Sequence, residues 1–162
     1  MSFSISNNVY ANYMAPAFVG MKEDSMDDNV DTFAASDPGL GVAIGVVVQR
    51  TGASAMTVKN GATAGLIVGV SLHDHVAGYL GQYPDKTAVS VLTRGRVWAA
   101  VDSGTGVVDG AACKCDATTG KFNTTGVAVT NAVFRSQAIN LLNVDGVTTT
   151  LAAVVELHNP NV

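Results

Sequence analysis

Charged residues are scarce in this chain. Only 14% of the 162 residues are Asp, Glu, Lys or Arg, whereas soluble domains usually carry about 25%. A protein that works alone needs surface charge to stay dispersed. The low content therefore predicts that part of the surface is covered in an assembly, although an unusual Ala- and Gly-rich monomer would have the same composition.

Clustered basic residues and long apolar runs are also missing. The nine Lys and Arg residues are scattered and the net charge is −4, which argues against a nucleic-acid partner because phosphate binding needs clustered basic groups. No apolar run reaches the roughly 20 residues that span a membrane. Residues 1–10 lack the basic segment and apolar stretch of a signal peptide, so we expect synthesis in the cytosol and no membrane partner.

Cysteine and histidine are too rare to predict a metal or redox site. Cys113 and Cys115 point to the same side of a strand but are too close along the chain for an easy disulfide. His73 and His75 could share a metal ion, but such a pair needs a third ligand, and the remaining histidine is the distant His158. We therefore expect neither a metal nor a cofactor.

Motifs for catalysis are likewise missing. The sequence has no Gly-x-Ser-x-Gly nucleophile elbow and no phosphate loop. The glycines of residues 39–45 have the wrong spacing for a dinucleotide loop, and they precede a predicted strand rather than a helix. Most acidic residues lie in the first 40 residues or beside turn glycines, where Asp is favoured for backbone reasons. The protein is therefore not expected to be an enzyme.

The residues that are present divide the chain into two parts. Residues 1–40 are rich in Asn, Ser, Met and acidic residues and show little periodicity, which predicts an extended N-terminal arm. Residues 41–162 contain short strand-like runs separated by turn signals, which predict a β body. The expected fold is all-β: a small antiparallel β-sandwich or barrel, jelly-roll-like, preceded by the arm.

The longest strand-like run covers residues 87–102. One of its faces is almost entirely apolar, which predicts a sheet with one buried face. Gly95 interrupts the run and predicts a bulge that bends the strand. Asn60-Gly61 predicts a hairpin turn, and Asp145-Gly146 is expected to join the last two strands. We expect further strands at residues 42–50, 64–74, 111–116, 121–123, 132–143 and 148–158.

Two groups of residues are candidates for interfaces. Arg94, Arg96 and Trp98 alternate on the other face of the 87–102 run, and Arg and Trp are typical of interface hot spots. Two solvated arginines around a partly buried Trp would give the same pattern. The arm is too apolar for a purely solvated tail. Its candidate contact residues are Tyr10, Tyr13, Met14, Phe18 and Met21.

Three stretches, taken in order, resemble the structural cement or decoration proteins of tailed-bacteriophage capsids. The first contains residues 15–21, Asp24-Ser25-Met26 and residues 41–45, in which a polar arm leads to the first strand. The second is Thr93–Val101, similar to a Gly-x-Val-Trp-Val strand of that family. The third combines residues 108–113 with 118–122, similar to a hairpin of the family. The resemblance covers residues 15–157 and departs from the family pattern at residues 113–115.

The resemblance implies a structural virion protein that stabilises the head shell. Its expected partners are the major capsid protein and further copies of itself, with a trimer favoured over a dimer because capsids offer three-fold and two-fold positions. Its expected location is the outer capsid surface, after synthesis in the host bacterial cytoplasm. Alternatives are a head-fibre base, a tail component or a secreted carbohydrate-binding β-domain, although glycan binding usually needs more aromatic residues than the 6% present.

We expect the arm to carry much of the capsid attachment, since a flexible segment with apolar anchors can order along a neighbour. The acidic run of residues 23–31 would then face basic groups on the shell, and attachment would weaken at high salt. Alternatively, the arm wraps its own oligomer, and the face of Arg94, Arg96 and Trp98 meets the capsid.

Overall fold

The expected all-β class is confirmed. The computed structural model describes residues 17–24, 27–53, 55–75, 80–143 and 147–160, and its named elements are all strands. Within these ranges no helix is long and apolar enough to cross a membrane. The strands are β1 (Asn29–Ala35), β2 (Val42–Ala43), β3 (Val47–Arg50), β4 (Thr57–Asn60), β5 (Ile67–Ser71), β6 (Gln82–Tyr83), β7 (Ala88–Ala100), β8 (Ala112–Cys115), β9 (Phe122–Asn123), β10 (Val127–Phe134), β11 (Ile139–Leu142) and β12 (Thr149–His158).

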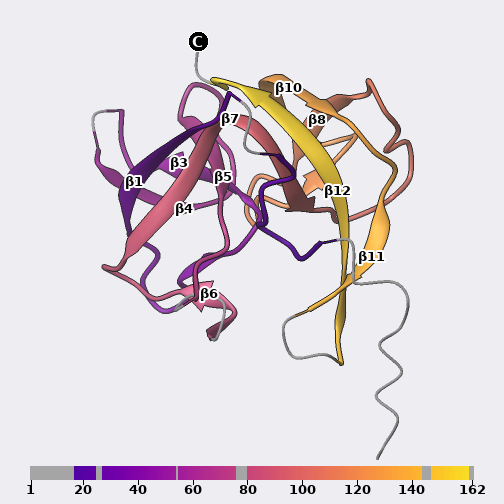
Figure 1. The fold of residues 1–162 in the computed structure, drawn as a ribbon. Helices are drawn as coiled ribbons and strands as arrows, with labels where there is room; N and C mark the ends of the chain where they lie inside the picture. The colour runs from indigo at the N-terminus through magenta and orange to yellow at the C-terminus, as the bar shows by residue number, and fades with distance from the viewer. Residues whose placement is uncertain (1–16, 25–26, 54, 76–79, 144–146, 161–162) are drawn as a thin grey trace, which may run out of the picture.

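Five of these strands close into a barrel (Figure 1). Strands β1, β4, β3, β5 and β7 pair in this order, and β1 also pairs with β7, so that the sheet returns to its first strand. The pairing of β1 with β4 is parallel, and the other pairs of the barrel are antiparallel. The barrel is thus mixed, whereas the sequence pattern predicted an antiparallel one.

The sheet continues beyond the barrel on the other half of β7. There β12 pairs with β7, and β10, β8 and β9 follow in order. β11 pairs with β12 in a hairpin, as expected for strands joined across Asp145-Gly146, although the turn itself lies outside the described residues. The long strand β7 therefore connects the barrel to the second part of the sheet (Figure 1).

A bulge lies close to the predicted position in β7. Asn29 is paired with Arg94 but the next residue, Val30, is paired with Leu92, so β7 has one extra residue at this point. Gly95 follows with a φ of 120°, a backbone angle that residues other than glycine rarely adopt. One extra residue reverses the direction in which the following side chains point.

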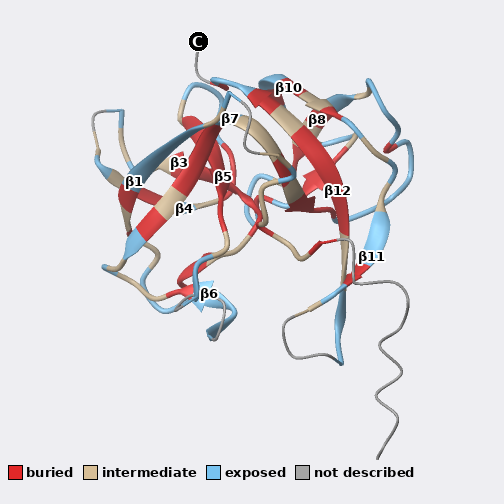
Figure 2. Cartoon of the chain, viewed as in Figure 1, coloured by how far each residue is buried: buried red, intermediate tan, exposed pale blue. Residues whose placement is uncertain are grey.

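This reversal distributes the apolar residues of β7 between two cores. Val89 and Val91 belong to the barrel core before the bulge, whereas Val97 and Ala99 belong to the second core after it. Ala100, of the opposite parity, returns to the barrel core. The apolar face predicted from alternation is buried, but it serves two cores rather than one (Figure 2).

The C-terminal part of the expected arm belongs to the barrel. Strand β1 lies within residues 1–40, and its Phe33 and Ala35 are 6% and 2% exposed. Its first residues are exposed and include Asp31, which is why the sequence pattern did not reveal a strand. The expected boundary at residue 40 therefore does not coincide with the edge of the barrel. An arm over residues 1–16 stays a prediction, since these residues lie outside the described ones.

Local signals misplaced three other features. Gly45, with a φ of 71°, divides the expected 42–50 strand into β2 and β3. The expected 132–143 strand is divided between β10 and β11. Asn60-Gly61 is not a hairpin turn, because β4 and β5 on its two sides both pair with β3.

Candidate functional site

The chain's own N-terminal segment pairs with the edge of β7 that carries the predicted Arg–Trp face. Residues 20–23 run antiparallel along β7, where the Gly20 N–H donates to the Trp98 carbonyl at 2.7 Å and the Trp98 N–H donates to the Met21 carbonyl at 2.9 Å. The Trp98 side chain is half-buried and packs with Met21 against a small core of Ala17, Leu141 and Ala152. Trp98 and Met21 thus contribute to the fold of their own chain.

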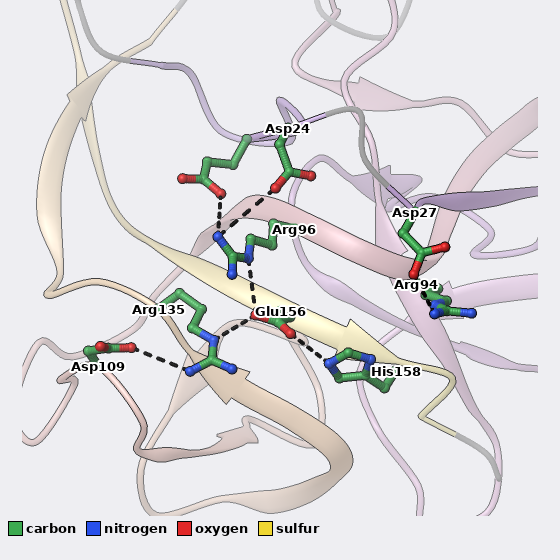
Figure 3. Close-up of polar contacts among 9 residues, drawn as sticks. Asp24, Asp27, Arg94, Arg96, Asp109, Arg135, Glu156 and His158 are labelled. Carbon is green, nitrogen blue, oxygen red and sulfur yellow. Dashed lines mark hydrogen bonds and ion pairs between the residues drawn. The ribbon is translucent and has the colours of Figure 1, made fainter.

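The two arginines of this face lie in ion pairs within the chain. Arg96 reaches Glu23 at 3.5 Å and Asp24 at 4.0 Å, and Arg94 reaches Asp27 at 2.5 Å (Figure 3). Lys22 forms a further pair with Asp28. The acidic run that was expected to face basic groups on the shell therefore has basic partners in its own chain, because the β7 arginines lie directly beside it.

A second ionic cluster surrounds Glu156 on β12. Its Oε2 accepts from Nε of Arg135 at 2.6 Å and from Nε of Arg96 at 3.0 Å, and its Oε1 lies 2.7 Å from Nε2 of His158 (Figure 3). Arg135 also reaches Asp109 at 3.7 Å. The hydrogen bond from Arg135, the second arginine and His158 lower the pKa of Glu156 to about 2, against desolvation. The cluster connects β7, β10 and β12, with Arg135 directly after β10, and Arg96 joins it to the N-terminal segment.

The Glu156→Gln variant should lose about 1–2 kcal/mol of stability at neutral pH, because it removes the charge that both arginines share. The Glu156 side chain is 14% exposed but its arginine partners are near 40%, so solvent weakens the effect. Its folded pKa of about 2 lies below the ordinary 4.5, so the contribution is complete above pH 4.5 and disappears as pH falls toward 2.

Urea melts at neutral and acidic pH would measure this difference. The gap between the native protein and Glu156→Gln should shrink on acidification. Glu23→Gln is a matched control, since Glu23 is a more exposed partner of Arg96 and should matter little. Equal stability of Glu156→Gln and the native protein at neutral pH would contradict the prediction.

Two of the three histidines lie near each other, and the third belongs to the Glu156 cluster. His73 and His75 have ring centroids 6.4 Å apart, while His158 contacts Glu156. The ring of Phe18 packs edge-on against His73 at 4.5 Å, so this predicted interface residue also contacts its own chain. Burial and the neighbouring His75 lower the pKa of His73. Within the described ranges, no three His, Cys, Asp or Glu residues are placed to hold a metal ion.

The two cysteines lie in the second core. Cys113 and Cys115 are 2% and 0% exposed and are not bonded to each other. Burial raises the pKa of the Cys113 thiol strongly and that of Cys115 to about 12, so neither forms a thiolate readily at neutral pH. Their side chains act as small apolar core residues.

A groove of about 700 Å³ lies beside the start of the described chain. Its walls are mainly apolar and come from the barrel, the N-terminal segment and the β11–β12 hairpin. They consist of Phe18, Val19, Ala43, Ile44, Val46, His73, Leu80, Gly81, Ala100, Lys121, Asn143, Thr148 and Thr150. These groove walls include one histidine, His73, and no carboxylate. The acidic residues of the ionic clusters do not line the groove.

The strand pairing defines an all-β protein built on a closed barrel, and its described ion pairs connect segments of the same chain. The chain belongs to the family of phage structural cement proteins (E217 gp24/Pam3 gp6), which it matches over residues 5–156. This confirms the family expected from the sequence and supports a structural role in the virion. No curated protein matches the chain.

Of the predicted contact residues, the structure brings together Phe18, Met21, Arg96 and Trp98 around the start of the described chain. Arg94 lies further along β7 with Asp27. Tyr10, Tyr13 and Met14 lie outside the described residues. Sequence reasoning missed Glu156 and Arg135, for which no local signal exists because they meet Arg96 only through the pairing of distant strands.

Proposed function

We propose that this protein binds the outer surface of a tailed-phage capsid and stabilises the shell without catalysis. The observation that carries the proposal is the match to the structural cement proteins over nearly the whole chain. The partners are the major capsid protein and further copies of this chain, in a trimer or a dimer, the states that capsid symmetry accommodates. The low charge of the chain supports an assembled protein with covered surface.

Within this proposal, the arm is the capsid anchor rather than the face of Arg94, Arg96 and Trp98. Both arginines of that face have partners in their own chain, and Trp98 is half-buried and packs with Met21 against a small core of the same chain. Residues 1–16 carry no charged side chain but contain aromatic and aliphatic residues. Such a segment can bury apolar area on a neighbour, at a cost of about 1–2 kcal/mol for each backbone residue that orders. Several arms per oligomer offset this cost through effective concentration.

Truncation of residues 1–16 tests the anchor. This deletion leaves Ala17 and the segment paired with β7 intact, so the melting temperature should stay close to that of the full chain. Binding to purified undecorated heads, measured by co-sedimentation, should fall by at least about tenfold. The charge-removing Arg94→Ala variant is the control and should bind heads nearly as well as the native chain.

Two outcomes would count against different parts of the proposal. A truncated protein that binds heads as well as the full chain would show that the arm is not the anchor. A full-length protein that neither binds heads nor raises their resistance to heat would overturn the cement function itself.

A further inference from the structure

Strand β11 is a free edge of the large sheet. Its four residues pair along one side with β12, from Ile139 with Ala152 to Leu142 with Thr149. On the other side no named strand of the described chain pairs with it. The barrel closes on itself, and β9 at the far end of the sheet has only two residues. Among the described residues, β11 is thus the longest edge of this sheet that has no strand on its outer side, and it lies at the periphery with exposed residues (Figure 2).

This edge lacks the features that usually keep free edges apart. Natural edge strands are protected by charged side chains, Pro residues or bulges. Residues 136–143 contain no charged residue and no Pro, and the β11–β12 register is regular. Ile139 and Leu142 are 38% and 45% exposed, and Asn140 is also exposed. An uncharged and partly apolar edge of this kind is expected to be covered by another strand.

We propose that β11 pairs antiparallel with β11 of a second copy across a two-fold axis, which joins the two sheets into one. A strand that pairs with itself in this way presents the same residues from both sides, so its lack of charge removes any self-repulsion. With the two-fold axis at Leu141, Asn140 lies opposite Leu142 of the second copy on one face, and Leu141 lies opposite its own counterpart on the other. The unpaired backbone groups of both edges then find partners.

The proposal places the dimer ahead of the trimer that the sequence favoured, because pairing of β11 with itself joins two copies only. It also places two arms at one interface. Ala17, at the start of the described chain, packs against Leu141 of β11, so the arms of both copies begin beside the shared strands. The inference concerns the isolated protein and does not depend on binding to a shell.

Lysine substitutions on the exposed face of β11 test the pairing. Asn140→Lys and Leu142→Lys each bring like charges together across the axis and should raise the dimer dissociation constant at least about tenfold. In analytical ultracentrifugation at micromolar concentration, the native protein should be a dimer and both variants mainly monomers. Val108→Lys makes the same kind of change at a loop residue that is 50% exposed, and should remain a dimer. Thermal melts of the variants, each close to that of the native protein, show that the fold is intact.

Chemical cross-linking provides a second and independent test of the β11 pairing. In Asn140→Cys the new thiols lie on the same face as diagonal neighbours across the axis, roughly 7–8 Å apart, so a short bis-maleimide should join two chains. The native thiols of Cys113 and Cys115 are buried with raised pKa values and should not react. Val108→Cys should give no covalent dimer. A native protein that is a monomer or a trimer, lysine variants that remain dimers, or Asn140→Cys that fails to cross-link would overturn the proposal.

Discussion

Replacement of Phe122 by Ala is expected to lower the free energy of unfolding by about 3–5 kcal/mol, because it leaves a large cavity in the second core. Phe122 is fully buried and packs edge-on against Phe134 at a centroid distance of 6.1 Å. Its backbone also joins separate parts of the fold, since its carbonyl accepts from the N–H of Asp102 at 2.8 Å. The substitution would therefore weaken the packing at the place where the end of β7 meets β9 and β8.

Differential scanning calorimetry would measure this loss as a decrease in melting temperature of roughly 10 °C or more. Phe122→Leu keeps most of the apolar volume and should cost only about 1 kcal/mol. Met56→Ala, at a residue that is 65% exposed, should stay within about 0.5 kcal/mol of the native protein. A Phe122→Ala protein as stable as Phe122→Leu would show that the site collapses without a cavity.

Gly120→Ala is expected to cost about 3 kcal/mol, because this glycine combines a positive φ with close contact to the barrel. Its φ is 71°, and an added Cβ would lie 2.3 Å from the carbonyl oxygen of Val47. The Gly120 carbonyl meanwhile accepts from the N–H of Val47 at 2.8 Å. The loop after β8 is therefore held directly against strand β3, and a side chain would force the two apart.

Gly110→Ala provides the matched control, since Gly110 has a φ of 81° but nothing within 4 Å of an added Cβ. It should show only the backbone cost of a positive φ, about 1 kcal/mol. Urea melts of both variants separate the two effects. Equal losses at the two glycines would contradict the prediction, because the contact with Val47 would then contribute nothing.

The glycine at position 120 also shows why turn signals identify some features better than others. Its loop lies between the strands expected at residues 111–116 and 121–123, and β8 and β9 do pair across this loop. The same reasoning failed at Asn60-Gly61, where the added Cβ of Gly61 would meet the carbonyl oxygen of Ala117 at 2.3 Å. That glycine is required by a neighbour distant in sequence rather than by a turn, and a local pattern cannot distinguish the two reasons.

The candidate site was predictable only in part, for a similar reason. Alternation placed Arg94, Arg96 and Trp98 on one side of the longest strand, and a bulge near Gly95 was expected. Ion pairs with Glu156 and the acidic segment depend on which strands lie beside β7, and neither composition nor spacing specifies strand order. The arginines consequently appeared as candidates for binding a partner, whereas in the structure they connect segments of their own chain.

By itself, the sequence determined the all-β class, the family and the positions of most strands, because side-chain alternation and turn chemistry act between neighbours along the chain. Only the tertiary structure decided that β1 belongs to the barrel, that β1 and β4 are parallel, and that β7 serves two cores. It also decided that β11 has β12 as its one partner among the named strands of the described residues. These features follow from pairing between residues far apart in sequence, whose free energy depends on the closed barrel as a whole rather than on any local segment.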